Sequence, residues 1–212
     1  SLVQYNKVLL QRNKLLKELF FKPEYEETLD VWDMQLVNYG KEVIRFRREF
    51  IGRLNEIMQK IHLSLSGNKE EIKISYEPYT IEDQFGQTLK RNRPQDMKQK
   101  TTLSGPHRDD ISFIVNGIDI RRFGSQGQQR TAALSLKLSE LELVKAVSRD
   151  NPILLLDDVL SELDSSRQNH LLSAIQDIQT MITCTGLDDF VNNRFHIDKI
   201  FKVIDGTVEN EN

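Results

Sequence analysis

The stretch that decides the fold runs from Phe123 to Asp164. It begins FGSQGQQRT at residues 123–131, continues as a long helical pattern, and then gives PILLLDD at 152–158 and SELD at 161–164. A Ser/Gly/Gln turn that opens a helix is therefore followed by an apolar strand that ends in paired carboxylates. This order of elements predicts an α/β fold.

The turn at Ser125 has the composition of an anion-binding helix start. Ser125 is a good N-cap, because its hydroxyl can accept a hydrogen bond from a free amide of the first turn. Apolar residues follow at helical spacing between Ala132 and Val147. Free N–H groups and the positive end of the helix dipole would then face a ligand such as phosphate, and Gly127 would let the backbone approach it. A capped amphipathic helix with no ligand explains the same residues.

The run from Ile153 to Leu156 is typical of a strand buried on both faces. Asp157 and Asp158 follow at its carboxyl end, where ligands bind in open α/β sheets. One carboxylate there can hold Mg²⁺, and the second can orient or deprotonate a water molecule. A core strand whose aspartates merely begin the next turn is the alternative, and the neighbouring motifs weigh against it.

Three motifs in this stretch resemble those of ABC-type ATPases. SQGQQR at 125–130 looks like their signature motif, ILLLDD at 153–158 like their Walker B strand, and SELD at 161–164 like their D-loop. GPHRDD at 105–110 and QRNKLLK at 11–17, in an opening segment from Gln4 to Lys17, are similar to the RecF family of bacterial recombination proteins. The resemblance covers the whole chain. It implies an ABC-ATPase-type head subdomain, a mostly parallel sheet with helices, that carries an antiparallel helical arm.

The resemblance also implies roles for individual residues. Asp157 would bind Mg²⁺, and Asp158 would be the catalytic residue that positions or activates the attacking water. Ser161 and Asp164 of the D-loop would lie near the seam of an ATP-dependent homodimer. The nucleotide held by one subunit would be contacted by the signature residues of the other, namely Ser125, Gln126, Gly127 and Gln128.

One strand end departs from the wider ABC superfamily. A histidine that senses the γ-phosphate commonly stands there, whereas this chain has Thr183, Cys184 and Thr185. Thr183 is the switch candidate, and which of the three residues contacts phosphate stays open.

Composition argues against a strongly basic protein, a disulfide-linked protein and a membrane protein. The chain has 212 residues, a net charge of −3 and one cysteine, so it is no polycation and has no internal disulfide or cysteine metal cluster. No apolar run is long enough to span a membrane, and no signal-peptide pattern is present. We therefore expect no membrane partner, with a cytoplasmic location as the default.

The segments before the signature motif predict an arm and a linking region. Helices are expected over Leu2–Phe21 and Leu29–Leu65, paired as an antiparallel hairpin in an arm of residues 1–66, although an ordinary helical bundle would give the same pattern. Residues 67–122 would return the chain to the head. They should contain a strand at Ile72–Tyr79, a helix broken near Pro94, and a hairpin around Asn116-Gly117.

Residues 123–212 would form the C-terminal lobe of the ATPase. Its last strand is expected at Lys199–Ile204, and residues 210–212 would be a frayed tail. Basic residues upstream could follow a phosphate backbone, although a solvated face is the simpler explanation for them. The DNA-binding candidates are Arg45, Arg48, Lys90, Arg91 and Arg93.

No stretch matches the phosphate-binding loop Gly-x-x-x-x-Gly-Lys-Ser/Thr, also called Walker A. RecF-like proteins carry that loop in a lobe before the arm, so this chain is expected to be a C-terminal fragment that neither binds nor hydrolyses ATP alone. The full protein would use ATP and Mg²⁺ as a weak, DNA-stimulated ATPase.

The resemblance implies work in DNA repair and recombination. Partners would be double-stranded DNA next to single-stranded gaps, and RecR and RecO, which promote RecA loading. An ATPase head of the SMC type, a transporter-type ABC ATPase, and a module that binds DNA or protein without hydrolysis are the alternatives. SMC arms run for hundreds of residues, and a transporter-type subunit would carry the histidine that this chain lacks.

Overall fold

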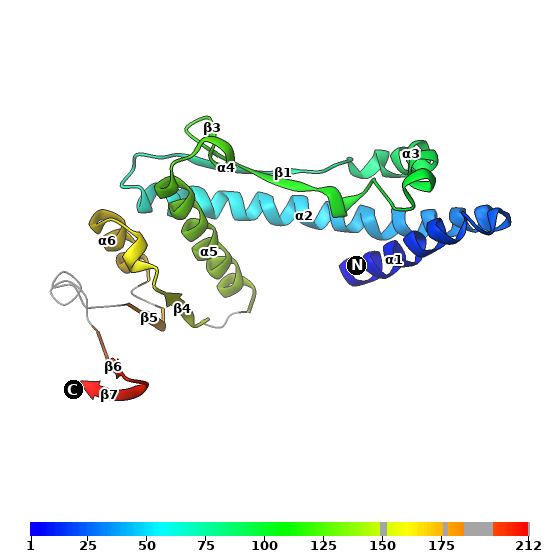
Figure 1. Cartoon of the computed structure of the whole chain (residues 1–212). Coiled ribbons are helices and arrows are strands. Elements are labelled where there is room, and N and C mark those ends of the chain that lie inside the picture. The colour runs from blue at the N-terminus through cyan, green and yellow to red at the C-terminus, as the bar shows by residue number, and fades with distance from the viewer. Residues whose placement is uncertain (149–151, 176–177, 185–196, 212) are drawn as a thin grey trace.

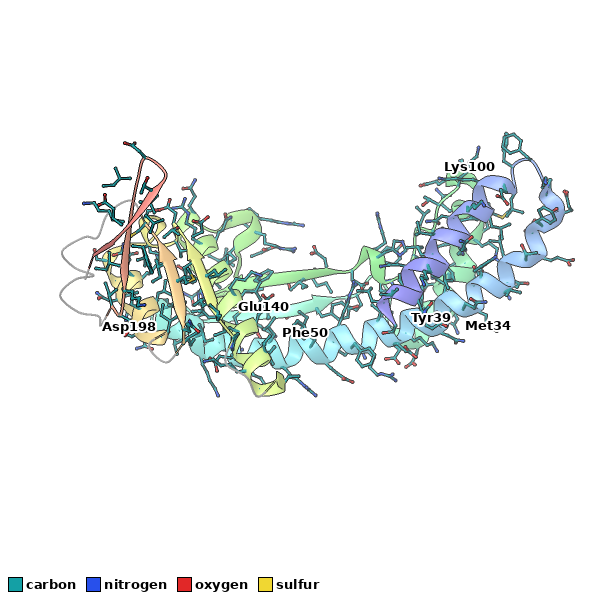
Figure 2. All side chains as sticks on the ribbon, turned by 90° about the horizontal axis from the view of Figure 1, so that it is seen from below. Met34, Tyr39, Phe50, Lys100, Glu140 and Asp198 are labelled. Atoms are coloured by element: carbon teal, nitrogen blue, oxygen red, sulfur yellow. The ribbon has the colours of Figure 1, made fainter. Side chains whose placement is uncertain are left out.

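The computed structural model describes residues 1–148, 152–175, 178–184 and 197–211. The molecule is elongated, because one helix, α2 (Leu29–Leu65), runs along most of it (Figure 1). Helices α1 (Leu2–Glu18) and α3 (Phe85–Gln99) pack against one end of α2. Figure 2 shows Lys100 and Asp198 at opposite ends of the molecule.

Strands β1 (Ile72–Glu77) and β2 (Asp110–Val115) pair antiparallel beside the middle of α2. Beyond them, α5 (Gln126–Ser148) packs on the other end of α2, near α6 (Ser165–Ala174). The smaller elements are β3 (Ile118–Asp119), α4 (Ile120–Phe123), β4 (Leu154–Asp157), β5 (Thr180–Thr183), β6 (Ile200–Ile204) and β7 (Thr207–Glu211), with 3-10 turns at Pro23–Thr28, Glu82–Gln84, Pro106–Arg108 and Leu160–Glu162.

The chain thus has the expected α/β class with a helical arm. Strands β4 and β5 pair in parallel, which is the arrangement expected around the Walker B segment. In the described part of the chain the other two sheets, β1-β2-β3 and β6-β7, are antiparallel. No described helix is long and apolar enough to cross a membrane.

The arm is held together by apolar packing around one buried arginine. Residues from α1, α2 and α3 share clusters of buried side chains that include Tyr5, Leu36 and Phe85. Arg12, which is fully buried, donates to Asp33 at 2.6 Å and to Asp96 at 2.8 Å. Because Asp33 lies on α2 and Asp96 on α3, the arginine joins all three helices.

Several sequence predictions need correction. Helix α3 does not break near Pro94 but continues to Gln99, because Asp96 in its last turn is anchored by Arg12 and by the Leu103 amide. The C-terminal residues up to Glu211 are not frayed but form β7 against β6.

Strand ends differ as well. The strand after Asn116-Gly117 stops at Asp119, whose carboxylate accepts a hydrogen bond from the Arg121 amide and so starts α4. Strand β4 is not buried on both faces, since the side chain of Leu155 is 68% exposed. The first helix ends at Glu18 and β1 at Glu77, short of the predicted Phe21 and Tyr79.

Candidate nucleotide site

The signature turn closes as a capping box. Ser125 Oγ accepts a hydrogen bond from the Gln128 amide at 3.2 Å, and the Gln128 side chain accepts one from the Ser125 amide at 3.0 Å. Two otherwise free donors are thereby satisfied within the turn. Ser125 and Gln126 remain exposed to solvent, so the start of α5 is accessible to a ligand.

Gly127 faces the side chain of an arginine that sequence reasoning missed. A Cβ added to Gly127 would lie 3.1 Å from Arg167 Nη1. Arg167 Nη1 also forms an ion pair with Asp164 of the D-loop segment at 3.0 Å. The signature turn and the D-loop of the same chain therefore meet at one guanidinium. The Asp-x-x-Arg spacing, with Asp164 capping α6, is the sequence signal that could have revealed it.

Asp164 itself is held by its own helix. Its carboxylate accepts a hydrogen bond from the Arg167 amide at 3.0 Å. That bond, together with the charge of Arg167, keeps the pKa of Asp164 below its usual value. An ionised Asp164 is the form that caps α6 and pairs with Arg167.

The paired carboxylates lie beside the predicted switch residue. The parallel register of β4 and β5 places Asp157 opposite Thr183, and the Thr183 hydroxyl donates to Asp157 Oδ1. The amide of Asp158 hydrogen-bonds Thr183 Oγ1 at 3.1 Å and the Thr183 carbonyl at 3.2 Å. Among Thr183, Cys184 and Thr185, the structure brings Thr183 to the carboxylates, while Thr185 lies outside the described residues.

Asp158 has an unusual backbone conformation. Its φ is +52°, in the left-handed region that aspartate tolerates better than most residues. Ser161 Oγ donates to the Asp158 carbonyl at 2.8 Å, which ties the start of the D-loop to the end of the Walker B segment. This conformation turns the chain sharply after β4 and sets Asp158 apart from Asp157.

The donor set fits Mg²⁺ better than a metal that needs an all-protein cage. Asp157 and Asp158 are exposed carboxylates, and Mg²⁺ typically takes one or two such ligands and completes its shell with water and phosphate. The described residues contain no group of three or more His, Cys, Asp or Glu side chains arranged to hold a metal ion. Asp157, steadied by the Thr183 hydroxyl, is the better-oriented ligand.

Comparison with known proteins shows which proteins the chain resembles. A scan against protein-family models finds no match. The chain is 58% identical over 214 residues to the DNA replication and repair protein RecF of Lachnospira eligens, and 56% identical over 209 residues to that of Agathobacter rectalis. These alignments take in 100% and 99% of this chain. Over essentially its whole length, the chain is similar in sequence to RecF proteins.

Solved RecF structures agree with the sequence match. The chain superposes on the recombination mediator protein RecF-ATP of the RecFOR pathway with a TM-score of 0.84 and 34% identity, over 100% of this chain and 57% of that one. RecF-ATPrS gives a TM-score of 0.82 and 35% identity, over 99% and 57%. The chain also spans 59% and 58% of the two RecF relatives, so it corresponds to a little under three-fifths of a RecF protein.

The basic residues predicted to bind DNA differ in whether they already form ion pairs within the chain. Arg93 forms ion pairs with Asp30 and Asp33, and Arg48 pairs with Glu82 at 3.6 Å. Because both make ion pairs within the arm, they would have to exchange partners to reach phosphate. The exposed candidates are Arg45, which lies over the Phe46 ring, and Lys90 and Arg91 on α3.

The RecF-type hexapeptide GPHRDD joins the arm to the β-sheet. His107 Nδ1 lies 2.7 Å from the Tyr5 hydroxyl, and its Nε2 lies 3.0 Å from the Thr102 carbonyl. Burial lowers the pKa of His107, so the neutral ring fits these two contacts. Asp109 accepts from Arg47 at 3.0 Å and from the Tyr76 hydroxyl. This motif therefore fixes the base of the arm.

Proposed function

We propose that this chain supplies the signature, Walker B and D-loop half of an ATP-dependent DNA repair and recombination protein. One observation carries the proposal. Thr183, Asp157 and Asp158 lie together at the carboxyl end of a parallel strand pair. An accessible, capped signature turn begins helix α5 of the same chain. The sequence similarity to RecF proteins and the likeness to RecF-ATP support it.

In the whole protein, two subunits would close on ATP as a homodimer. Asp157 would hold the Mg²⁺ that accompanies the nucleotide, and Asp158 would orient and deprotonate the attacking water. Ser125, Gln126, Gly127 and Gln128 would receive the γ-phosphate of the nucleotide bound to the other subunit. ATP would then favour the closed state over the open one, and hydrolysis would release it.

The biological partners follow as part of the same proposal. The protein would bind double-stranded DNA at the border of a single-stranded gap and act with RecR and RecO to promote RecA loading. The exposed basic residues Arg45, Lys90 and Arg91 are the first candidates for phosphate contacts. Binding through them would weaken as salt rises, because each neutralised phosphate releases counterions.

The test is ATP hydrolysis by the whole RecF protein, measured with and without double-stranded DNA. We expect slow turnover that DNA accelerates, and no turnover by the 212-residue chain alone. If the whole protein binds ATP but does not hydrolyse it under either condition, the paired carboxylates serve metal binding only. The protein would then be a nucleotide-gated clamp.

A further inference from the structure

Arg167 occupies a junction that none of the motifs explains. It lies on the first turn of α6, directly after the D-loop, and its side chain is 25% exposed. Its guanidinium pairs with Asp164 at 3.0 Å and stands beside Gly127 of the signature turn. The guanidinium is bonded to Asp164 and packs against Gly127, where the absence of a Cβ leaves room for it.

The rest of the signature helix is already anchored. Ser135 on α5 lies 3.0 Å from Nδ1 of His62, a fully buried residue of α2, and its hydroxyl donates to the Thr131 carbonyl at 2.7 Å. The Thr131 hydroxyl in turn donates to the Gly127 carbonyl at 2.8 Å. The contact with His62 joins α5 to α2, and the other two bonds run along α5 from Ser135 to Gly127. The exposed turn before Gly127 is stabilised by its capping box and lies next to Arg167.

We propose that Arg167 is a positioning residue that locks the signature turn and the D-loop of one subunit into a single rigid surface. The inference rests on the proposed function, because that surface is the one presented to the nucleotide of the other subunit. It also gives Gly127 a role within this chain, since a Cβ there would lie 3.1 Å from Arg167 Nη1 and the guanidinium would have to shift by a few tenths of an ångström.

The first experiment needs no ATP. Amide hydrogen exchange of the whole protein is followed at Gln128, Gln129, Arg167 and Gln168, whose amides are bonded within the two turns. Arg167→Ala should speed exchange several-fold in both turns. The control is Lys145→Ala, which removes another i,i+3 ion pair of similar exposure, Lys145 with Glu142, away from the signature turn. Unchanged exchange at Gln128 and Gln129 in Arg167→Ala would overturn the proposal.

The second experiment measures ATP-dependent dimerisation by sedimentation velocity. Arg167→Ala should raise the protein concentration needed for dimers about tenfold, because small misplacements of reacting groups are costly. ATP binding to each monomer should stay unchanged, and Arg167→Lys should rescue only part of the loss. Gly127→Ala should cost less in the Arg167→Ala background than in the wild type, since the two residues are in contact.

The two experiments distinguish failure of the positioning role of Arg167 from failure of the proposed ATP-dependent function. If the wild-type protein forms no ATP-dependent dimers, the proposed function fails, while hydrogen exchange still decides whether Arg167 holds the two turns. If the wild type dimerises and Arg167→Ala dimerises equally well, the positioning role fails alone.

Discussion

Replacing Arg12 with Met should unfold the arm more than any exposed substitution on the same helices. Arg12 is fully buried and pairs with Asp33 and with Asp96, which is also fully buried. Its Nη1 donates to the Thr102 hydroxyl at 2.7 Å as well. Methionine would fill most of the volume but leave Asp96 as a buried carboxylate without a counter-charge.

The magnitude follows from that loss of charge compensation. Removing one partner of a buried ion pair typically costs about 3–5 kcal/mol, because the other charge stays desolvated. Asp33 contributes less to the penalty, since it keeps its second partner, Arg93. We therefore expect Arg12→Met to lower the free energy of unfolding of the arm by about 3–5 kcal/mol at neutral pH.

Acidity should relieve part of this loss. Burial already raises the pKa of Asp96 above its usual value, and the attraction of Arg12 opposes that rise. Without Arg12 the pKa of Asp96 should rise further, so the folded variant binds a proton that the unfolded chain has released. Stability of Arg12→Met should therefore fall as pH increases above the ordinary aspartate range, and its deficit against the wild type should be smaller near pH 5.

The chain provides its own probe for this measurement. Trp32 is the sole tryptophan and packs against the buried clusters of the arm, next to Asp33. Urea unfolding followed by Trp32 fluorescence, at acidic and neutral pH, gives the change in stability. Arg45→Met is the matched control on an exposed site of α2 and should stay within about 0.5 kcal/mol of the wild type. Adding Asp96→Asn to Arg12→Met should recover stability. A loss below about 1 kcal/mol, as for a surface ion pair, would refute the reasoning.

Three further substitutions test other parts of the structure. Asp158→Asn in the whole protein should slow hydrolysis by about 10²–10⁴-fold, as expected for loss of a general base, while ATP-driven dimers still form; wild-type turnover would contradict the assigned role. Ser125→Arg should block ATP-dependent dimerisation but spare ATP binding by each monomer, and normal dimers in sedimentation would count against the signature assignment. Gly105→Ala should destabilise the arm base by about 2 kcal/mol or more, because φ is +134° there and a Cβ would lie 2.5 Å from the Tyr5 hydroxyl. Unchanged urea unfolding of that variant would disprove the steric argument.

Local rules succeeded wherever one segment determines its own structure. The apolar stripe of α2 predicts its bounds, Leu29–Leu65, and Asn116-Gly117 forms the expected tight turn with φ values of +48° and +83°. The predicted helix break at Pro94 is wrong, because a partner distant in sequence stabilises the helix beyond it. The helix continues there because Asp96, two residues on, is bound by Arg12, which lies 84 positions away in sequence. Arg93 was likewise placed among the free basic residues, since nothing local reveals its pairing with Asp30 and Asp33.

In the candidate site, too, residues within one motif can be predicted from sequence, whereas contacts between motifs cannot. Motif spacing is enough to predict Asp157, Asp158 and the signature turn as site residues, because each motif is contiguous in sequence. Arg167 escaped notice, because its second neighbour, Gly127, lies 40 positions earlier and belongs to another helix. Contacts between two motifs, such as that of Arg167 with Gly127, are not visible in the sequence of either motif alone.

Helix α2 belongs to the arm at one end and contacts the signature helix at the other. Helix α2 has 37 residues and is therefore about 55 Å long at 1.5 Å per residue. Near its start it carries Asp33, bound to the buried Arg12, and near its end it carries His62, which contacts Ser135 on the signature helix. A helix packed along its length transmits displacement better than a loop does, because its backbone bonds resist bending. A displacement of the arm would therefore reach α5 through α2, across the contact between His62 and Ser135.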